Sequence, residues 1–126
     1  MSLRALTGIS AGEYRGRRRQ LMDAVGQQAI IVLPAAAEKV RSHDTHYPYR
    51  QDSSFHYLTG FNEPEAVLVL VPGRRHGEVI LFCRERHPER EMWDGPRAGT
   101  TGAVSLYGAD DAYPIEDIDE ILPGLL

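Results

Sequence analysis

Two short apolar runs, separated by a loop of six residues, constrain the fold of this chain more than any other feature. Residues 66–71 and 78–83 are rich in Val, Ile and Leu and are too short for a typical helix. The loop between them contains Pro72, Gly73 and Gly77 and has the length of a hairpin connection. The sequence therefore predicts two adjacent antiparallel strands, the first of which is central in a sheet.

The first predicted helix spans residues 10–25. Ser10 and Glu13 have the spacing of a capping box, and Gly26 follows as a natural stop. The apolar residues of this segment fall at helical intervals and form one stripe: Tyr14, Leu21, Met22 and Val25. Four arginines lie mostly on the other face: Arg15, Arg17, Arg18 and Arg19. We interpret them as a solvated helix face or a contact to another domain, because no interleaved aromatic residues suggest nucleic-acid binding.

Two further helices are predicted. Residues 52–60 have Asp52 as an N-cap and Gly60 as a left-handed exit, which favours a short helix. Residues 114–122 begin with Pro114 and place four apolar side chains on one face: Ile115, Ile118, Ile121 and Leu122. The apolar residues 121–126 either dock back on the domain or are covered by a following domain, and we favour the second alternative.

The remaining segments complete the predicted fold. Residues 29–33 predict a strand covered on both faces, and residues 104–107 a small edge strand. Residues 35–51 are expected to be an ordered loop, and residues 84–97 a charged, irregular segment. Together these elements predict a single α/β domain, a three-layer sandwich in which helices flank a mixed β-sheet.

Composition excludes several classes of protein. The chain has 126 residues and a formal charge of −4, so neither nucleic acid nor an acidic membrane is expected as a partner. Cys83 is the only cysteine, which excludes an internal disulfide and is consistent with a cytoplasmic location. Because Cys83 closes an apolar strand, we expect an inert, buried thiol.

No convincing catalytic or metal site is evident in the sequence. His43, Asp44 and His46 are the best metal-like cluster, but they lie in an irregular loop, and we favour a hydrogen-bonded polar loop. The glycines at 95, 99 and 102 match no phosphate-binding spacing, and no helix clearly follows them. No pair of carboxylates is placed for acid–base chemistry. We therefore expect no catalytic residue and no bound metal or other cofactor in this chain.

Trp93 is the one residue that the sequence singles out. It is the only tryptophan and lies in a charged segment beside Asp94 and Gly95, where periodicity does not require a core role. An amphipathic ring in such a place often serves at an interface. The alternative is a local role, in which Trp93 packs under its own loop.

Several segments together resemble the N-terminal domain of bacterial Xaa-Pro aminopeptidase (aminopeptidase P). The resemblance is carried by Tyr47-Pro48-Tyr49-Arg50-Gln51, by residues 55–70 with their Gly-Phe-Asn-Glu-Pro stretch, and by Trp93-Asp94-Gly95. It covers nearly the whole chain. Creatinases and prolidases share this domain type, and prolidases also resemble the Tyr-Arg-Gln to Glu-Pro region.

The resemblance implies the N-terminal, non-catalytic domain of a longer metallopeptidase with the creatinase/prolidase N-terminal fold. Such enzymes release the N-terminal residue from peptides whose second residue is proline. Their C-terminal "pita-bread" domain holds two divalent ions, typically Mn²⁺, and we expect that domain to lie outside this chain. In oligomeric relatives the N-terminal domain helps subunits to associate and borders a neighbour's active-site entrance, and Trp93 matches a tryptophan in that region.

Three hypotheses follow from the sequence. The first is a domain that shapes access to the active site of an Xaa-Pro aminopeptidase, with the catalytic domain, other subunits and proline-containing peptides as partners. The second is the corresponding domain of a prolidase, or a stand-alone interaction module without catalysis. The third is a small metal-dependent enzyme that uses His43, Asp44 and His46.

Overall fold

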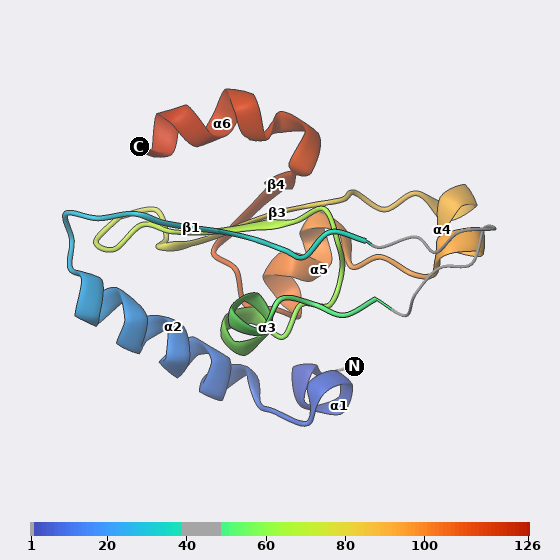
Figure 1. Ribbon diagram of the computed structural model, residues 1–126, viewed down its shortest axis with the longest axis horizontal. Coiled ribbons are helices and arrows are strands. Elements are labelled where there is room, and N and C mark those ends of the chain that lie inside the picture. The colour runs from blue at the N-terminus through green and yellow to red at the C-terminus, as the bar shows by residue number, and fades with distance from the viewer. Residues whose placement is uncertain (1, 39–48) are drawn as a thin grey trace.

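The computed structural model describes residues 2–38 and 49–126, and it is a three-layer α/β sandwich (Figure 1). A four-stranded sheet forms the middle layer, in the order β1-β2-β3-β4: β1 (Ile31–Pro34), β2 (Val67–Leu70), β3 (Val79–Cys83) and β4 (Asp111–Pro114). Strands β1, β2 and β3 pair antiparallel, whereas β4 pairs parallel to β3. The mixed sheet and the predicted hairpin are therefore confirmed.

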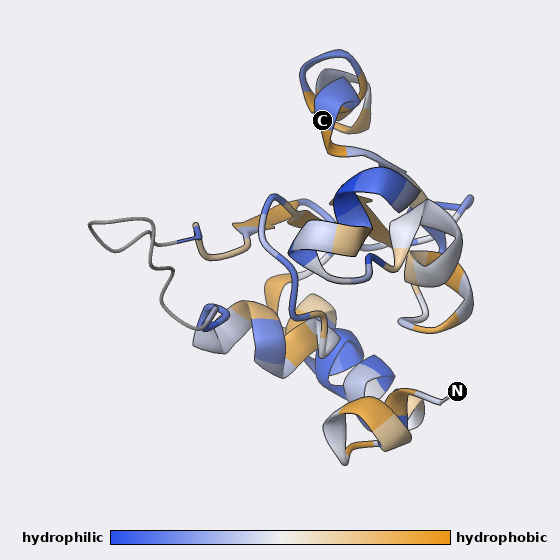
Figure 2. Ribbon diagram, turned by 90° about the vertical axis from the view of Figure 1, so that its right-hand side faces the viewer, coloured by the Kyte–Doolittle hydropathy of each residue, from blue (hydrophilic) through white to orange (hydrophobic). Residues whose placement is uncertain are grey.

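Helices cover both faces of this sheet. On one side lie α1 (Leu3–Thr7), α2 (Ala11–Val25), α3 (Ser53–Thr59) and α5 (Gly99–Ser105). On the other side lies α6 (Ile118–Leu125), which follows a short 3₁₀ turn, η1 (Ile115–Asp117). The view of Figure 2, turned by 90°, again places the sheet between α6 and the N-terminal helices.

The alternation of side chains along the two central strands builds a core on each face of the sheet. Leu68 and Leu81 face α2, α3 and α5, where they join Phe55 and Phe61 in the larger cluster. The alternate residues of these two strands point to the other face of the sheet, toward α6, and form the smaller cluster: Val69, Ile80 and Phe82. All three side chains of the smaller cluster are fully buried, because α6 covers them. The continuous apolar runs of β2 and β3 are therefore explained by burial on both faces of the sheet.

The termini of α2 and α3 confirm their local sequence signals. The Ser10 hydroxyl accepts the Glu13 N–H at 3.2 Å, and the Asp52 carboxylate accepts the Phe55 N–H at 2.9 Å. Gly60 ends α3 in the left-handed conformation, with φ 69°. Only half of the predicted capping box forms, because the Glu13 carboxylate binds Arg17 at 3.3 Å.

Several predicted elements are wrong. Residues 104–107 do not form an edge strand: α5 ends at Ser105, and its Ala103 packs into the larger cluster while Val104 is 43% exposed. The edge strand is instead β4, which the sequence did not reveal. A parallel neighbour of β3 needs a crossover connection, and α5 supplies it.

Strand β1 is an edge strand whose residues alternate between partly buried and exposed, so the predicted cover on both faces is wrong. The segment 84–97 is not irregular throughout, because it contains α4 (Pro88–Asp94). The predicted helix 114–122 starts later, at Ile118, since Pro114 ends β4. Its apolar face docks back on the sheet, which is the alternative that we did not favour.

Candidate functional site

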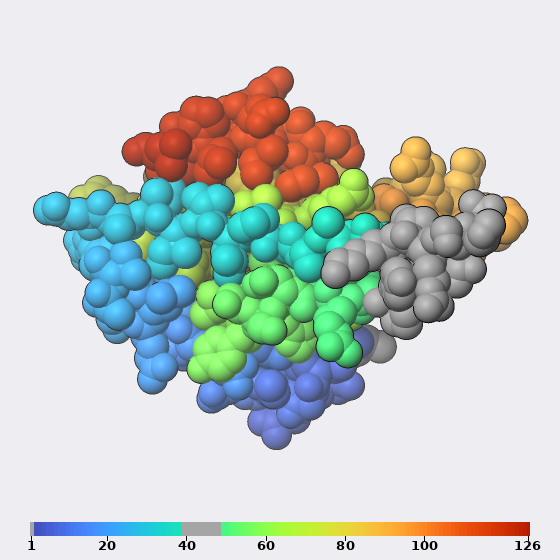
Figure 3. Space-filling view, viewed as in Figure 1, coloured from blue at the N-terminus to red at the C-terminus, as the bar shows by residue number. Residues whose placement is uncertain are grey.

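Trp93 lies on α4, which protrudes at one end of the molecule (Figures 1 and 3). The indole is 89% exposed, and the neighbouring Met92 side chain is 84% exposed. Trp93 therefore does not pack under its own loop. We name residues 84–98 the arm: they leave the end of β3, form α4 and return to the start of α5.

A hollow of about 430 Å³, the Trp93 hollow, lies where the arm meets the sheet. Its described lining residues are Glu38, Tyr49, Asn62, Glu63, Pro64, Arg84, Trp93, Asp94, Gly95 and Pro96. Three segments that carried the family resemblance in sequence thus meet at one place. They are the Tyr-Arg-Gln segment, the Asn-Glu-Pro turn and the Trp-Asp-Gly segment.

Gln51 organises the wall of this hollow, although sequence reasoning gave it no role. Its side chain is buried, with its Nε2 donating to the carbonyls of Phe61 at 3.1 Å and Glu63 at 3.0 Å. Its Oε1 accepts the N–H groups of Ala36 at 2.8 Å and Asp52 at 2.9 Å. One amide therefore joins four backbone positions. The signals in the sequence were its place in the Tyr-Arg-Gln segment of the family resemblance and its position in the predicted ordered loop.

Tyr49 extends the same network. Its hydroxyl donates to the Ala36 carbonyl at 2.7 Å and lies 2.9 Å from Gln51 Oε1. Burial raises the pKa of the Tyr49 hydroxyl above its usual value, so it stays protonated and acts as a donor. The role of these contacts is positional, since a neutral phenol held in this way is no proton acceptor.

Glu63 and Arg84 form an ion pair in the wall of the Trp93 hollow. Arg84 Nη2 lies 3.4 Å from Glu63 Oε1, and each side chain is 14% exposed. Glu63 Oε2 also accepts the Ala98 N–H at 2.9 Å. This carboxylate is already bound by two donors, so its role in the hollow is structural.

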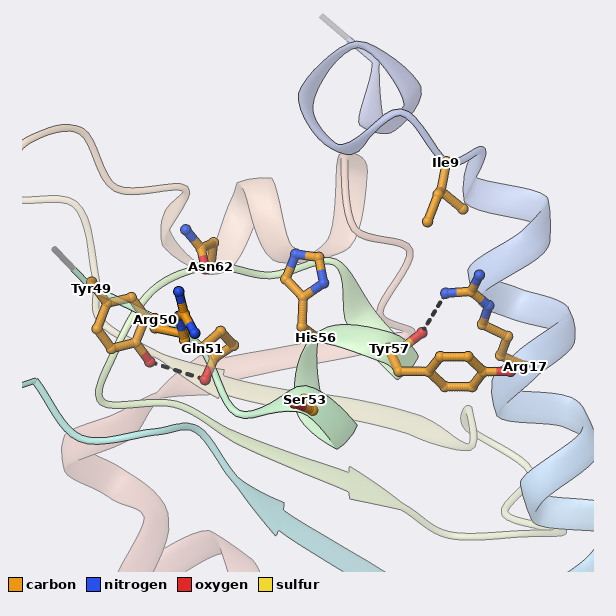
Figure 4. Close-up of a pocket in the computed structure, with 9 residues that line it drawn as sticks. All are labelled: Ile9, Arg17, Tyr49, Arg50, Gln51, Ser53, His56, Tyr57 and Asn62. Atoms are coloured by element: carbon orange, nitrogen blue, oxygen red, sulfur yellow. Dashed lines mark hydrogen bonds between the residues drawn. The ribbon is translucent and has the colours of Figure 1, made fainter.

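A second, larger hollow of about 890 Å³ lies between α2, α3 and residues 49–51 (Figure 4). Arg17 stacks over the Tyr57 ring with its guanidinium carbon 4.2 Å from the ring centroid, and it donates to the Tyr57 carbonyl at 3.0 Å. His56 and Ser53 project from α3 into the same space, yet no hydrogen bond joins them. No nucleophile–base pair is therefore assembled among the described residues of this hollow.

The arginines of α2 are mostly engaged within the domain. Arg18 is only 2% exposed, and its Nη1 donates to the Leu58 carbonyl at 2.8 Å, so the predicted solvated face is wrong for this residue. Burial lowers the pKa of Arg18 from its usual value. Arg19 pairs with Glu78 at 2.7 Å and with Asp23 at 3.0 Å.

Other candidates from the sequence have simple outcomes. Cys83 is buried, as predicted, and burial raises its pKa to about 12, which disfavours the reactive thiolate. The cluster of His43, Asp44 and His46 lies outside the described residues. Within residues 2–38 and 49–126, no three His, Cys, Asp or Glu side chains lie close enough together to hold a metal ion.

In the same residues, no helix is long and apolar enough to cross a membrane. A helix does follow Gly95, since α5 begins at Gly99.

Comparison with known proteins identifies the family of the chain. A family model described as "Aminopeptidase P, N-terminal domain" matches residues 14–126. The chain belongs to this family. The resemblance inferred from the sequence is therefore confirmed, and so is the α/β fold.

Individual members of the aminopeptidase P family are similar over nearly the whole chain. Rat Xaa-Pro aminopeptidase 3 is 42% identical over 94% of this chain, and Xaa-Pro aminopeptidase of Escherichia coli strain K12 is 41% identical over 96%. The solved structure of Pseudomonas aeruginosa aminopeptidase PepP superposes with a TM-score of 0.90 at 61% identity and covers 93% of this chain. This chain spans only 26% of the rat protein, 28% of the E. coli protein and 26% of the PepP chain, about a quarter of each.

Proposed function

We propose that this chain is the N-terminal, non-catalytic domain of a longer Xaa-Pro aminopeptidase. Two observations support the proposal. The family is defined by the N-terminal domain of aminopeptidase P, and the relatives that carry the name Xaa-Pro aminopeptidase are about four times as long as the matched region. The reaction would then be hydrolysis of the bond between an N-terminal residue and a following proline.

The proposed role of the domain is to shape access to the active site and to supply surface for subunit association. The protruding arm supports this role, because it carries two large apolar side chains, Met92 and Trp93, that no core of the domain covers. We propose that Trp93 borders the entrance through which proline-containing peptides reach the catalytic domain. A rigid wall near a reactive centre restricts substrates by shape alone and needs no chemistry of its own.

Within residues 2–38 and 49–126, no three His, Cys, Asp or Glu side chains are grouped so that they could hold a metal ion, which supports a metal site elsewhere in the longer enzyme. We therefore place the two divalent ions, typically Mn²⁺, in the catalytic domain. When bound there, such ions would activate water and polarise the scissile carbonyl. We further propose a homo-oligomeric enzyme of the cytoplasm.

The single observation that carries the proposal is the match of residues 14–126 to the N-terminal domain of aminopeptidase P. The test compares two purified proteins with an Xaa-Pro peptide and Mn²⁺: the 126-residue chain, and the same chain extended by the coding sequence that follows it in its genome. We expect turnover by the extended protein only. Measurable cleavage by the pure 126-residue chain would refute the non-catalytic role.

Two alternatives are separated by the same preparation. A prolidase would cleave Xaa-Pro dipeptides and leave longer peptides intact, whereas an aminopeptidase cleaves the longer ones. A stand-alone interaction module would have a stop codon directly after Leu126. The names of several relatives favour the aminopeptidase, since three mammalian and two bacterial relatives carry the name Xaa-Pro aminopeptidase.

A further inference from the structure

Two carboxylates, Glu63 at the base of the arm and Glu91 beside its exposed tip, each bind both sides of the arm. The arm has an outgoing limb, residues 84–87, and a return limb, residues 95–98, with α4 between them. Met92 and Trp93 on α4 are almost fully exposed and gain little order from packing. The hydrogen bonds of α4 fix its local conformation, and polar contacts between the two limbs fix α4 relative to the rest of the domain.

Glu63 closes the base of the arm. One of its oxygens lies 3.4 Å from Arg84 Nη2 on the outgoing limb, and the other accepts the Ala98 N–H of the return limb at 2.9 Å. Arg97 adds a direct link, since its Nη1 donates to the Glu85 carbonyl at 3.2 Å. The two limbs are therefore held together where they join the sheet.

Glu91 closes the arm again, next to the exposed pair. Its Oε2 accepts the His87 N–H of the outgoing limb at 2.8 Å. Its Oε1 accepts the Arg97 N–H of the return limb at 2.8 Å and lies 3.2 Å from Arg86 Nη2. The Glu91 side chain is only 8% exposed, although it precedes the two most exposed large apolar residues of the described chain.

These contacts depend on the charge of Glu91. The Arg97 N–H holds the pKa of the Glu91 carboxyl below its usual value, and the Arg86 guanidinium and the His87 N–H act in the same direction. The ionised form is the one that accepts all these hydrogen bonds, and it is lost only as the pH falls through that lowered pKa. An amide in its place would retain a single acceptor oxygen.

We propose that Glu91 is a positioning residue: it joins the two limbs of the arm so that Trp93 is presented at a fixed place and angle. What Trp93 does there rests on the proposed access role. Because Glu91 holds both limbs, the Trp93 ring can lie far from the core and still be preorganised for a contact. Glu91 itself need touch neither substrate nor metal.

The first test measures amide hydrogen exchange in the 126-residue chain and in two variants, Glu91→Ala and Glu89→Ala. Glu89 lies on the same short helix and is exposed, so its removal is the matched control. In Glu91→Ala we expect exchange at the His87 and Arg97 amides to rise about tenfold or more, because both lose their acceptor. Amides of β2 and β3 should keep their rates in both variants. Unchanged exchange at His87 and Arg97 would overturn the proposal.

The second test measures peptide hydrolysis by the longer enzyme with Glu91→Ala, Trp93→Ala and both substitutions together. We expect Glu91→Ala to lower kcat/KM on the order of tenfold, chiefly through KM, since small misplacements of a contact are costly. In the Trp93→Ala background the same change should have no further effect, because Glu91 acts through Trp93. Glu89→Ala should leave kcat/KM unchanged.

The outcomes distinguish the positioning role from the access role. A loss of activity by Glu91→Ala that persists without Trp93 would overturn the positioning role. A Trp93→Ala enzyme with unchanged kinetics would instead remove the access role proposed above, while the exchange data would still decide whether Glu91 holds the arm.

Discussion

The contact between Gly60 and Tyr14 gives the sharpest test of how the N-terminal helix packs. Gly60 has φ 69° and ψ 3°, a left-handed conformation that costs other residues about 1–2 kcal/mol. A β-carbon placed there would lie 2.8 Å from Tyr14 Cζ and 2.9 Å from its hydroxyl oxygen. Tyr14 is fully buried, so its ring has little room to move.

Gly60→Ala should therefore lower the free energy of unfolding through two effects. The backbone effect is about 1–2 kcal/mol, and forcing extra volume into a packed core typically costs about 1–3 kcal/mol. Together they predict a loss of roughly 2–5 kcal/mol, measured by urea denaturation with far-ultraviolet circular dichroism. Tryptophan fluorescence is a poor probe here, because Trp93 is 89% exposed in the folded state.

Two other glycines separate these effects. Gly8 ends α1 with φ 79°, but a β-carbon added to it would have no atom within 4 Å, so Gly8→Ala should show at most the backbone effect. Gly16 lies in the exposed middle of α2 with open space around it, and Gly16→Ala should stabilise the protein by about 1 kcal/mol. If Gly60→Ala costs no more than Gly8→Ala, Tyr14 does not pack against Gly60 as described.

Three further predictions concern the core, the thiol and one ion pair. Val69→Asp should cost several kcal/mol in urea denaturation, because Val69 is fully buried beneath α6 and an unpaired carboxylate there loses its hydration; a loss below about 1 kcal/mol would contradict this packing. Cys83, with its pKa raised to about 12, should resist a thiol reagent in the native protein and react once urea unfolds it, whereas rapid labelling of the folded chain would show that the thiol is accessible. Glu78 has its pKa lowered, first by Arg19 and then by the Gly73 N–H, so its small stabilising effect is present above its unfolded pKa and disappears as the pH falls through the folded one. Glu78→Gln should therefore reduce the loss of folding free energy as the pH falls into the acid range. An unchanged dependence of stability on pH would argue against the ion pair of Glu78 with Arg19.

The elements predicted correctly are those whose signals are local. Helix α3 is defined by Asp52 at its start and Gly60 at its end, and both residues make the expected capping contacts. Strands β2 and β3 are fixed by apolar runs that leave no solvent face. Such signals depend on a few neighbouring residues, so one sequence is sufficient to recognise them.

The elements missed are those that depend on distant partners. The sequence of β4, Asp-Ala-Tyr-Pro, has no apolar run. It becomes a strand because β3 offers an edge for parallel pairing, where Ile80 and Leu81 lie opposite Asp111 and Ala112. Strand β1 looked fully buried from its composition, yet its place at the sheet edge leaves Val32 43% exposed. Position within a sheet is a property of the whole topology and is not encoded in the strand itself.

In the candidate site, too, one residue could be predicted from the sequence and others could not, but for a different reason. Trp93 could be singled out because an isolated aromatic residue in a charged segment needs an explanation, but the carboxylates that hold its arm could not. The sequence predicted only a charged, irregular segment at residues 84–97, whereas Glu63 binds Arg84 and Ala98, which lie 21 and 35 residues away from it in sequence. The limbs of the arm expose backbone N–H groups that no sheet or helix satisfies, and such groups require acceptors. An irregular segment with many glutamates can therefore be more ordered than its pattern suggests, provided that its carboxylates meet its own unpaired amides.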